Sequence, residues 1–551
     1  MSDEQSLSVW RGSVAPGLNC ARQWRAVGAL LAIGLSAPAM AQLRIAAWNI
    51  TNYAGGLTAD IQAVVYGVYQ GRSFAPDALM VQEVLSSSAT SALVTILNSA
   101  PGSPGDWAAA TFINGPDTDS AFFYRTSKLA LLGEPTIVVP GGNLQGAPRN
   151  VMRYDVRPLG YGAASTTIAM YSVHMKAGST SGDQSRRLAE AILIRDNAEA
   201  LPAGWNFLVG GDFNIQSSSQ AAYQELVGSQ VNNAGQFFDP INTPGSWNNN
   251  SLFRLVHTQD PADATGGMDD RHDQLLLSGG LVDGAGMDYI GNPAMAYRSF
   301  VSPALGQPVD NQQWEDPNHS YRAWGNDGTS YNGTLTVTES SSNGVALSPP
   351  RENGMVGATI AQAIKNCASG LGHIPVFLDV RVPPEVVADT FVDFGTVNLG
   401  ETAEQPLQVA NAGDVALWGE SGIASLSYTL AASEGFGAPA GPHSDSAGGG
   451  SNSHTIAMDT STPGPKSGTI TINSNSPDEP SRIVMLLGEV FAAPPPCMGD
   501  ANDDGAVNFL DVLAVLAGWG STGPAGDANH NGAVNFDDVV TALANWGAEC
   551  P

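Results

Sequence analysis

Positively charged residues are scarce in this sequence. Its 551 residues include 23 Lys and Arg but 52 Asp and Glu, which gives a formal net charge of −29 at pH 7. Contacts between basic side chains and phosphates provide most of the non-specific affinity of proteins for nucleic acid. The composition therefore excludes binding through a broad basic face. A phosphate-containing substrate would need a local site, most simply one built around a metal ion.

Charged residues in general, cysteine and long apolar runs are also sparse. Only 14% of the residues are charged, which argues against a coiled coil, whereas 43% are hydrophobic, which excludes disorder of the whole chain. A chain of this length buries a large core without disulfides or metals. The length predicts three or four domains, and the 63 Gly and 35 Pro indicate a turn-rich globular protein.

One apolar run stands out near the N-terminus. Residues 26–41 read AVGALLAIGLSAPAMA, follow Arg22 and Arg25, and end in an A-x-A pattern, as a secretory signal peptide does. We predict that residues 1–41 are removed and that the mature protein, starting at Gln42, is secreted or associated with the cell surface. A transmembrane anchor is the alternative, but the run is too short to span a bilayer comfortably. No other run is long enough, so we expect no membrane span.

Three of the four cysteines remain after this removal. Cys497 and Cys550 bracket the last segment of the chain and are able to form a disulfide in an oxidising compartment. Cys367 is left over, and we expect a small buried core residue there rather than a reactive thiol.

The mature chain separates by composition into three regions. Residues 42–383 alternate β-rich runs with helical stretches, which favours a layered α/β fold. Residues 386–491 consist of short alternating strands between Gly, Asn, Ser and Pro turns, a pattern typical of a β-sandwich. A Pro-rich joint at 493–496 leads to residues 497–551, which contain an internal repeat.

The repeat predicts two calcium-binding loops. GDANDDGAVNFLDVLAVLAGWG returns 27 residues later as GDANHNGAVNFDDVVTALANWG. Ca²⁺ takes six to eight oxygen ligands, and a glycine at loop position 6 allows the chain to turn around the ion. The ligands at positions 1, 3, 5, 7, 9 and 12 would be Asp500, Asn502, Asp504, Ala506, Asn508 and Asp511, and then Asp527, Asn529, Asn531, Ala533, Asn535 and Asp538.

The charge of this segment favours the same interpretation. Residues 497–551 contain eight acids and no Lys or Arg, so they would repel one another without a cation. We therefore expect Ca²⁺ to drive folding of the segment. Position 12 carries Asp instead of the usual Glu, which makes each loop a variant. Two polar turns without an ion are the alternative.

A set of polar residues in residues 42–383 predicts a catalytic site. They lie at the ends of predicted strands or in the loops that follow, where layered α/β proteins place their sites. The set comprises Asn49 in AAWNITNY, Glu83 in DALMVQEV, His174 in YSVHMKAG, Asp212 and Asn214 in LVGGDFN, Asp273 in DDRHDQLLLS and His373 in GHIPVFLDV.

Taken in this order, the motifs resemble the endonuclease/exonuclease/phosphatase superfamily, which includes the pancreatic-type deoxyribonucleases. The resemblance implies a four-layer α/β/β/α sandwich for residues 42–383 and metal-dependent hydrolysis of phosphoesters. FVDFGTVNLGE followed by LQVANAG, in residues 386–491, resembles immunoglobulin-like modules, for which a spacer or adhesion role is expected. The paired loops of residues 497–551 resemble small α-helical dockerin modules, which implies a cohesin-like docking partner.

Phosphodiester hydrolysis requires neutralisation of the phosphoryl charge and activation of a water molecule. Glu83 would bind Mg²⁺ or Mn²⁺, with Asn49 holding the metal or its waters. Asp212 would orient or activate the attacking water. Asn214 would donate to a phosphate oxygen.

Two histidines complete the expected site. His373 would serve as general base or phosphate-binding imidazole, and Asp273 would fix its tautomer through the other ring nitrogen. The resemblance implies that His174 contacts the phosphate from the far side, with Asp119 or Asp117 as its acidic partner. Arg149 could guide phosphate, but an ion pair is favoured. Each of these residues also has a purely structural alternative as a turn former, a solvated carboxylate or a core histidine.

One position departs from the family pattern. The family usually has Asp directly before its last histidine, whereas this chain has Gly372. The change removes an auxiliary metal-binding or water-binding carboxylate, for which Asp316 and Asp327 are candidate replacements.

The first hypothesis for function is therefore a secreted divalent-metal-dependent phosphodiesterase, foremost a nuclease. Within the same superfamily, the rival is a phosphatase or a sphingomyelinase-like phospholipase. A surface-binding protein with weakened catalysis is a third hypothesis, which Gly372 favours.

Overall fold

The computed structural model describes residues 43–69, 71–262, 266–295, 297, 300–301, 308–309, 319–337, 356–368, 370–412, 425–446, 450–492 and 497–550. The predicted signal peptide, the Pro-rich joint and Asp316 lie outside the described residues.

The first of two sheets in the N-terminal region contains the strand that opens the described chain. Its order is β12-β16-β1-β2-β4-β3, and β15 pairs with β16. β1 runs parallel to β2 and antiparallel to β16. The bounds of its described strands are β1 (Leu43–Tyr53), β2 (Ala78–Val84), β3 (Trp107–Ala109), β4 (Asp119–Arg125), β12 (Asp288–Tyr289), β15 (Arg322–Ala323) and β16 (Val376–Arg381).

The second sheet packs face to face against the first. Its order is β10-β11-β9-β8-β7-β5, with β6 paired to β7. Buried apolar side chains of both sheets form one hydrophobic cluster, and β1 and β2 lie opposite β8, β9 and β11. The bounds are β5 (Leu129–Leu131), β6 (Thr136–Val139), β7 (Val151–Pro158), β8 (Ile168–His174), β9 (Asn206–Asp212), β10 (Phe237–Phe238) and β11 (Asp273–Ser278).

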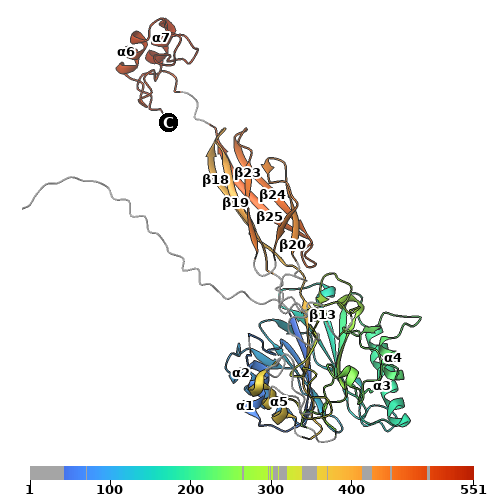
Figure 1. The fold of residues 1–551 in the computed structure, drawn as a ribbon. Coiled ribbons are helices and arrows are strands. Elements are labelled where there is room, and N and C mark those ends of the chain that lie inside the picture. The colour runs from blue at the N-terminus through green and yellow to red at the C-terminus, as the bar shows by residue number, and fades with distance from the viewer. Residues whose placement is uncertain are drawn as a thin grey trace, which may run out of the picture. The chain divides into compact units, whose positions relative to one another are not determined.

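Helices cover the outer faces of both sheets (Figure 1). α1 (Thr58–Tyr66), α2 (Ser87–Ser99) and α5 (Gly357–Cys367) lie on the side of the first sheet, and α3 (Ser181–Glu199) and α4 (Ala221–Val227) on the side of the second. The predicted α/β fold is confirmed for this region. Its remaining described elements are short: η1 (Ala164–Thr166), η2 (Ser251–Phe253), η3 (Gly279–Leu281), β13 (Phe300–Val301) and β14 (Pro308–Val309).

Local sequence explains where the longer helices begin. The Ser86 hydroxyl accepts a hydrogen bond from the Ala89 N–H at the start of α2. Thr180 and Asp183 form a reciprocal capping box at the start of α3. Such caps satisfy backbone N–H groups that have no partner within the helix.

Residues 386–491 form two sheets around a separate apolar core. One has the order β17-β19-β23-β21 and the other β18-β25-β24-β20-β22. Buried and exposed residues alternate along β25, as expected for a strand with one solvated face. The bounds are β17 (Val386–Ala388), β18 (Phe391–Asn398), β19 (Ala403–Asn411), β20 (Leu426–Ala432), β21 (Phe436–Gly437), β22 (His443–Asp445), β23 (Ser451–Met458), β24 (Gly464–Ser474) and β25 (Ser481–Phe491).

Residues 497–550 contain α6 (Phe509–Ala517) and α7 (Phe536–Ala544), which pack around a small core that includes Val515 and Ala542. The Cys497–Cys550 disulfide forms, with 5.6 Å between the two Cα atoms. Cys367 is buried in the core of the N-terminal region, as expected. Within the part of the chain that the structure describes, none of the helices has the length and hydropathy to cross a bilayer.

Gly211, directly before Asp212, lies where the chain has no space for a side chain. A Cβ on Gly211 would lie 2.1 Å from the Val173 carbonyl oxygen and 3.0 Å from Gln82 Nε2, and its φ of +134° disfavours any other residue. Gln82 Nε2 also donates to Ser172 Oγ across the two sheets (3.0 Å). This packing therefore leaves no room for a side chain directly before Asp212.

Replacement of Gly211 by Ala should lower the free energy of unfolding by about 1–3 kcal/mol, because the added methyl group meets backbone and the φ angle is strained. Chemical denaturation of the full chain measures this loss. Gly162→Ala is the matched control, since its Cβ would meet open space. Equal stability of the two variants would contradict the packing argument.

Candidate active site

Two pairs of parallel strands bring four of the predicted residues to one edge of the sandwich. In the first sheet, Asn49 of β1 is in register with Gln82, the residue before Glu83 in β2. In the second sheet, His174 ends β8 directly beside Asp212, which ends β9. Since the carboxyl ends of neighbouring parallel strands lie at the same edge, side chains from both sheets meet there.

The Asp212 carboxylate lies at the centre of this group. Asn49 Nδ2 donates to its Oδ2 at 3.2 Å. His174 Nε2 lies 3.4 Å from the same oxygen and His373 Nε2 lies 3.6 Å from it. Asp212 is 2% exposed. The structure thus surrounds a buried carboxylate with nitrogen atoms from both sheets.

Glu83 is held next to Asp212 but remains partly accessible. Asn49 Nδ2 donates to Glu83 Oε1 at 3.1 Å, and the Asn52 N–H donates to Oε2 at 2.8 Å. Glu83 has a φ of +62°, which is unfavourable for a residue other than glycine. His174 Nε2 lies 3.9 Å from Oε1. Glu83 and Asp212 therefore offer two carboxylates that share one amide group.

These residues fit the expected divalent cation. Mg²⁺ is normally held by one or two carboxylates and keeps several waters, so a closed cage of protein ligands is not required. Glu83 provides an accessible carboxylate, and the Asn49 amide already lies between it and Asp212. The Glu83 and Asp212 carboxylates are hard oxygen donors, which suit Mg²⁺ or Mn²⁺.

His373 and Asp273 form the predicted pair. His373 Nδ1 lies 2.6 Å from Asp273 Oδ2, and both side chains are buried. Asp273 starts β11 opposite Asp212 in β9, and its backbone N–H donates to Thr258 Oγ1 at 3.0 Å. With Nδ1 engaged, Nε2 is the nitrogen of His373 that points toward Asp212.

The protonation states follow from burial and from this cluster of charges. Burial raises the pKa of Asp212, but His373 and His174 outweigh this effect and lower it to about 2. Burial lowers the pKa of His174 to about 3, although Asp212 opposes the change. Burial also lowers the pKa of His373, but Asp273 and Asp212 outweigh it and raise the pKa to about 9. At neutral pH, Asp212 is therefore ionised, His174 is neutral and His373 is protonated.

Asn214 lies beside Asp212, but some of its hydrogen-bonding groups are used within the protein. Its backbone N–H donates to Asp212 Oδ1 at 2.9 Å, and its side-chain Nδ2 donates to the Met175 carbonyl at 3.2 Å. Its φ of +52° marks a tight turn after β9. One amide hydrogen of Asn214 remains for a phosphate oxygen.

The expected acidic partner of His174 is not found. Asp117 forms an ion pair with Arg149 (Nη2 to Oδ2, 2.9 Å), and Asp119 accepts the Gly115 N–H at 2.8 Å. In the described part of the chain, His174 Nδ1 has no hydrogen-bond partner. The prediction of Asp119 or Asp117 as this partner is therefore wrong, because Asp117 is paired with Arg149 and Asp119 accepts from its own loop instead of from His174. For Arg149, the ion pair favoured from the sequence is present.

The structure explains the glycine before His373. A Cβ on Gly372 would lie 2.4 Å from the Ala368 Cα, so no side chain fits there. Asp327, a candidate replacement, uses Oδ1 to accept the Thr329 N–H at 3.0 Å. Gln259 forms isolated β-bridges with both Asp270 and His373. Asp270 is therefore an acidic residue that the backbone brings near His373.

Gln259 and His272 belong to this region but were not predicted from the sequence as site residues. Gln259 Nε2 lies 3.5 Å from His373 Nε2. His272, the residue before Asp273, is buried with its ring centroid 6.2 Å from that of His373. The histidine in DDRHD was the available signal, whereas nothing in the sequence near Gln259 marks it.

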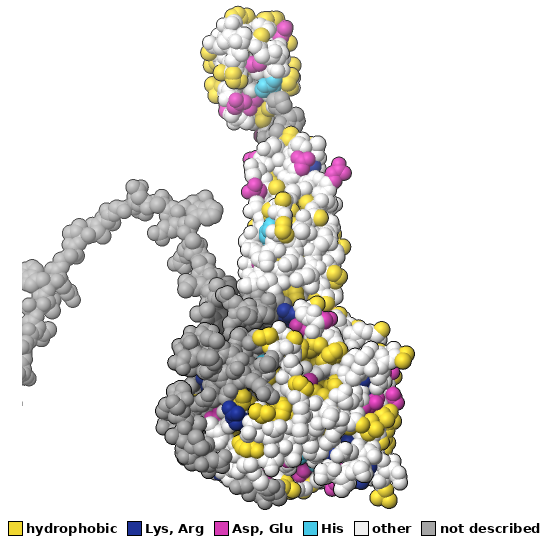
Figure 2. Space-filling view, turned by 45° about the vertical axis from the view of Figure 1, so that its right-hand side comes forward, with side chains coloured by type: hydrophobic (Ala, Val, Ile, Leu, Met, Phe, Trp, Pro, Cys, Tyr) yellow, Lys and Arg dark blue, Asp and Glu magenta, His cyan; other side chains and the backbone are white. Residues whose placement is uncertain are grey.

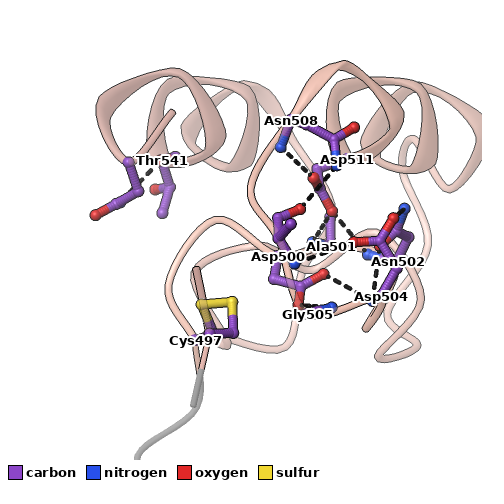
Figure 3. Close-up of a disulfide and its surroundings, with 12 residues drawn as sticks. Cys497, Asp500, Ala501, Asn502, Asp504, Gly505, Asn508, Asp511 and Thr541 are labelled. Atoms are coloured by element: carbon purple, nitrogen blue, oxygen red, sulfur yellow. Dashed lines mark hydrogen bonds between the residues drawn. A yellow bond between two sulfur atoms is a disulfide. The ribbon is translucent and has the colours of Figure 1, made fainter. Parts of the chain in front are cut away.

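The first tail loop folds around its own carboxylates (Figure 3). Asp500 accepts the N–H groups of Asp504 and Gly505, at 3.2 and 3.0 Å. Asp511 accepts those of Ala501 and Asn508, at 2.8 and 2.7 Å. These bonds curl positions 1 to 12 into one compact loop.

The second loop repeats this pattern. Asp527 accepts the N–H groups of Asn531 and Gly532 at 3.1 and 2.6 Å, and Asp538 accepts those of Asn529 and Asn535 at 3.1 and 2.8 Å. In both copies the residue at position 9 caps the following helix. Its amide also donates to the carbonyl at position 7, as Asn508 does to Ala506 and Asn535 to Ala533.

Residues 52–362, more than half of the chain, match the Endonuclease/Exonuclease/phosphatase family. The chain belongs to this family. The search of curated proteins gives no match.

Three solved structures that resemble parts of this member of the Endonuclease/Exonuclease/phosphatase family share little sequence identity with it. D. rerio TDP2 humanized by 14 mutations is 16% identical, with 45% of this chain and 90% of that chain covered and a TM-score of 0.31. The human nocturnin catalytic domain is 16% identical, with 45% and 85% covered and a TM-score of 0.29. A PapD-like domain of human CEP192 is 15% identical, with 20% and 88% covered and a TM-score of 0.17.

The raised pKa of His373 predicts how stability depends on pH. Its pKa is about 9 in the folded chain and about 6.5 when unfolded, so protonation of His373 favours folding below pH ~6.5. This contribution is lost as the pH rises from ~6.5 to ~9. The stability difference between the wild type and His373→Gln should shrink over that window. Denaturation at pH 6, 7, 8 and 9.5 measures it, and a constant difference would contradict the assignment.

Proposed function

We propose that this protein is an exported, divalent-metal-dependent phosphodiesterase, foremost a nuclease. The observation that carries the proposal is the convergence of Asn49, His174 and His373 on the ionised carboxylate of Asp212, with Glu83 held beside it. Membership of the Endonuclease/Exonuclease/phosphatase family supports hydrolysis of a phosphoester. Export rests on the predicted signal peptide at residues 1–41.

Each side chain has a chemical task in this proposal. Glu83 and Asn49 would hold the cation, which when bound neutralises phosphoryl charge. Asp212 is ionised and is able to orient the attacking water and accept its proton. His373 is protonated and, held by Asp273, donates to the phosphoryl group or to the leaving oxygen. The neutral His174 and the remaining hydrogen of Asn214 donate to other phosphate oxygens.

The substrate is proposed to be nucleic acid, with a phosphomonoester or a phospholipid as rivals. A solved D. rerio TDP2 is complexed with a single-strand DNA product. On the face shown in Figure 2, Lys and Arg side chains are scattered rather than gathered into one patch. The scarcity of Lys and Arg in the whole sequence favours recognition of a single scissile phosphate over tracking of a long duplex.

Asp212→Asn should lower kcat/KM for the hydrolysed phosphodiester by about 100-fold or more, because it removes the carboxylate that activates water. The assay uses plasmid DNA, single-stranded DNA, bis-p-nitrophenyl phosphate, a phosphomonoester and sphingomyelin, each with Mg²⁺, Mn²⁺ or Ca²⁺. Asp196→Asn is the matched control, since Asp196 is exposed on the outer helix α3.

The panel also separates the rival functions. Preference for the monoester or for sphingomyelin would replace the nuclease proposal with the corresponding esterase. If the wild type hydrolyses none of these substrates with any of the metals, the enzymatic proposal fails and a surface-binding role is left.

For the C-terminal segment, we propose two Ca²⁺ sites in a dockerin-like module. The carboxylates at positions 1 and 12 of both loops are buried, and the segment has no Lys or Arg to compensate them. Burial of an uncompensated charge is costly. A bound cation would supply the missing positive charge.

The surface of this segment supports docking to a cohesin-like partner. Large apolar side chains that are 44–65% exposed recur at the same 27-residue spacing on the two copies, and apolar surface of the module is visible in Figure 2. Clustered exposed apolar residues mark interaction surfaces. They are Phe509, Leu513, Leu516 and Trp519 in the first copy and Phe536, Val540, Leu543 and Trp546 in the second. The immunoglobulin-like residues 386–491 would then act as a spacer.

Removal of Ca²⁺ should destabilise the C-terminal segment. A ligand at 100 times its Kd stabilises the folded state by about 2.7 kcal/mol per site, so EDTA should lower the temperature of one transition in calorimetry of the full chain. Asp511→Asn should reproduce part of this loss. Asp503→Asn, an exposed residue at loop position 4, is the matched control. An EDTA-insensitive transition would contradict the proposal.

A further inference from the structure

A third histidine lies in the candidate active site without an assigned role. His272 directly precedes β11, and its ring centroid lies 6.2 Å from that of His373. It is also close enough to Asp212 and His174 to lower the pKa of each. His272 therefore belongs to the group of side chains around the Asp212 carboxylate.

The hydrogen bonds of His272 are incomplete. The residue is 6% exposed, and neither Nδ1 nor Nε2 has a hydrogen-bond partner among the described residues. A buried polar group left in this state costs about 1–3 kcal/mol. His257 shows the contrast, because its two ring nitrogens lie 3.2 and 2.9 Å from the carbonyl oxygens of Met268 and Trp247. The ring of His257 is held by backbone carbonyl groups, as expected for a histidine with a structural role, whereas the ring of His272 has no such partners.

A carboxylate stands beside His272 in a position to orient it. His272 Nε2 lies 3.7 Å from Asp270 Oδ1, and that oxygen accepts a 2.6 Å hydrogen bond from Asn248 Nδ2. Gln259 pairs with Asp270 on one side and His373 on the other. The Asp270–His272 pair therefore lies next to the Asp273–His373 pair, but its contact is longer by about 1 Å (3.7 against 2.6 Å).

The described site has few donors to spare for an anionic substrate. The Asn49 amide is used by Glu83 and Asp212, and one hydrogen of Asn214 is used by Met175. Arg149 is paired with Asp117. A phosphoryl group develops charge over several oxygens and requires more donors than these. An imidazole with both nitrogens unsatisfied would supply one.

We propose that His272, oriented by Asp270, donates a hydrogen bond to a non-bridging oxygen of the substrate phosphoryl group. This inference rests on the proposed function, because it assigns a substrate-contacting residue to the same site. The class of ligand is a phosphate ester. The Asp270–His272 pair would act beside Asp273–His373, with Asn248 holding Asp270 in place.

His272→Phe is the informative variant. It fills the same space without unsatisfied nitrogens, so thermal stability should be equal to or higher than that of the wild type. Loss of a hydrogen bond to a charged group should lower kcat/KM by about 10- to 100-fold. His257→Phe is the matched control and should behave in the opposite way, with lower thermal stability, because the ring N–H that donates to a buried backbone carbonyl is lost. Wild-type kcat/KM in a stable His272→Phe would overturn the inference.

A second measurement does not depend on turnover. In the full chain labelled with ¹⁵N-histidine, inorganic phosphate should shift the ring resonances of His272, which His272→Phe identifies by their absence. Unmoved His272 resonances would overturn the inference. If the wild type shows no hydrolysis on the substrate panel but phosphate still shifts His272, the proposed function fails while the phosphate contact is retained.

Discussion

The buried carboxylate of Asp212 is the constraint on which the candidate active site depends. An ionised group at 2% exposure is tolerated only if nearby donors compensate the lost hydration. Here the compensation comes from β1 in one sheet, β8 in the other and His373 before β16. The charge is therefore stable only when the two sheets are packed together. Both the stability of the fold and the proposed chemistry of the site therefore require that donors from the two sheets compensate the Asp212 charge.

Most residues of the candidate site were predictable from the sequence, because they lie at the ends of apolar runs that form strands. Asn49, Glu83, His174 and Asp212 all follow apolar runs that the structure forms as β1, β2, β8 and β9, and parallel pairing brings them to one edge. Short apolar runs show that strands exist but not which strands pair. The two facing sheets followed from the resemblance to a family and not from periodicity.

The site residues that the sequence did not reveal depend on contacts between distant segments. The partner of His174 was assigned wrongly because Asp119 and Asp117 are taken by neighbours in their own loop, Gly115 and Arg149. His272 lies in the DDRHD motif but was given no role from the sequence, and only the folded chain shows that neither ring nitrogen has a hydrogen-bond partner among the described residues. Chemical type and spacing predict which groups gather, whereas competition among local hydrogen bonds decides which of them remain free.

The close approach of Ala368 to Gly372 also bears on how the sequence can vary. No side chain fits at this position without displacement of the turn that follows α5. A single codon change to aspartate would therefore not place a carboxylate next to His373 without such a displacement. A side chain there would need coordinated remodelling of the loop, so the backbone of this chain keeps a carboxylate out of the position before His373.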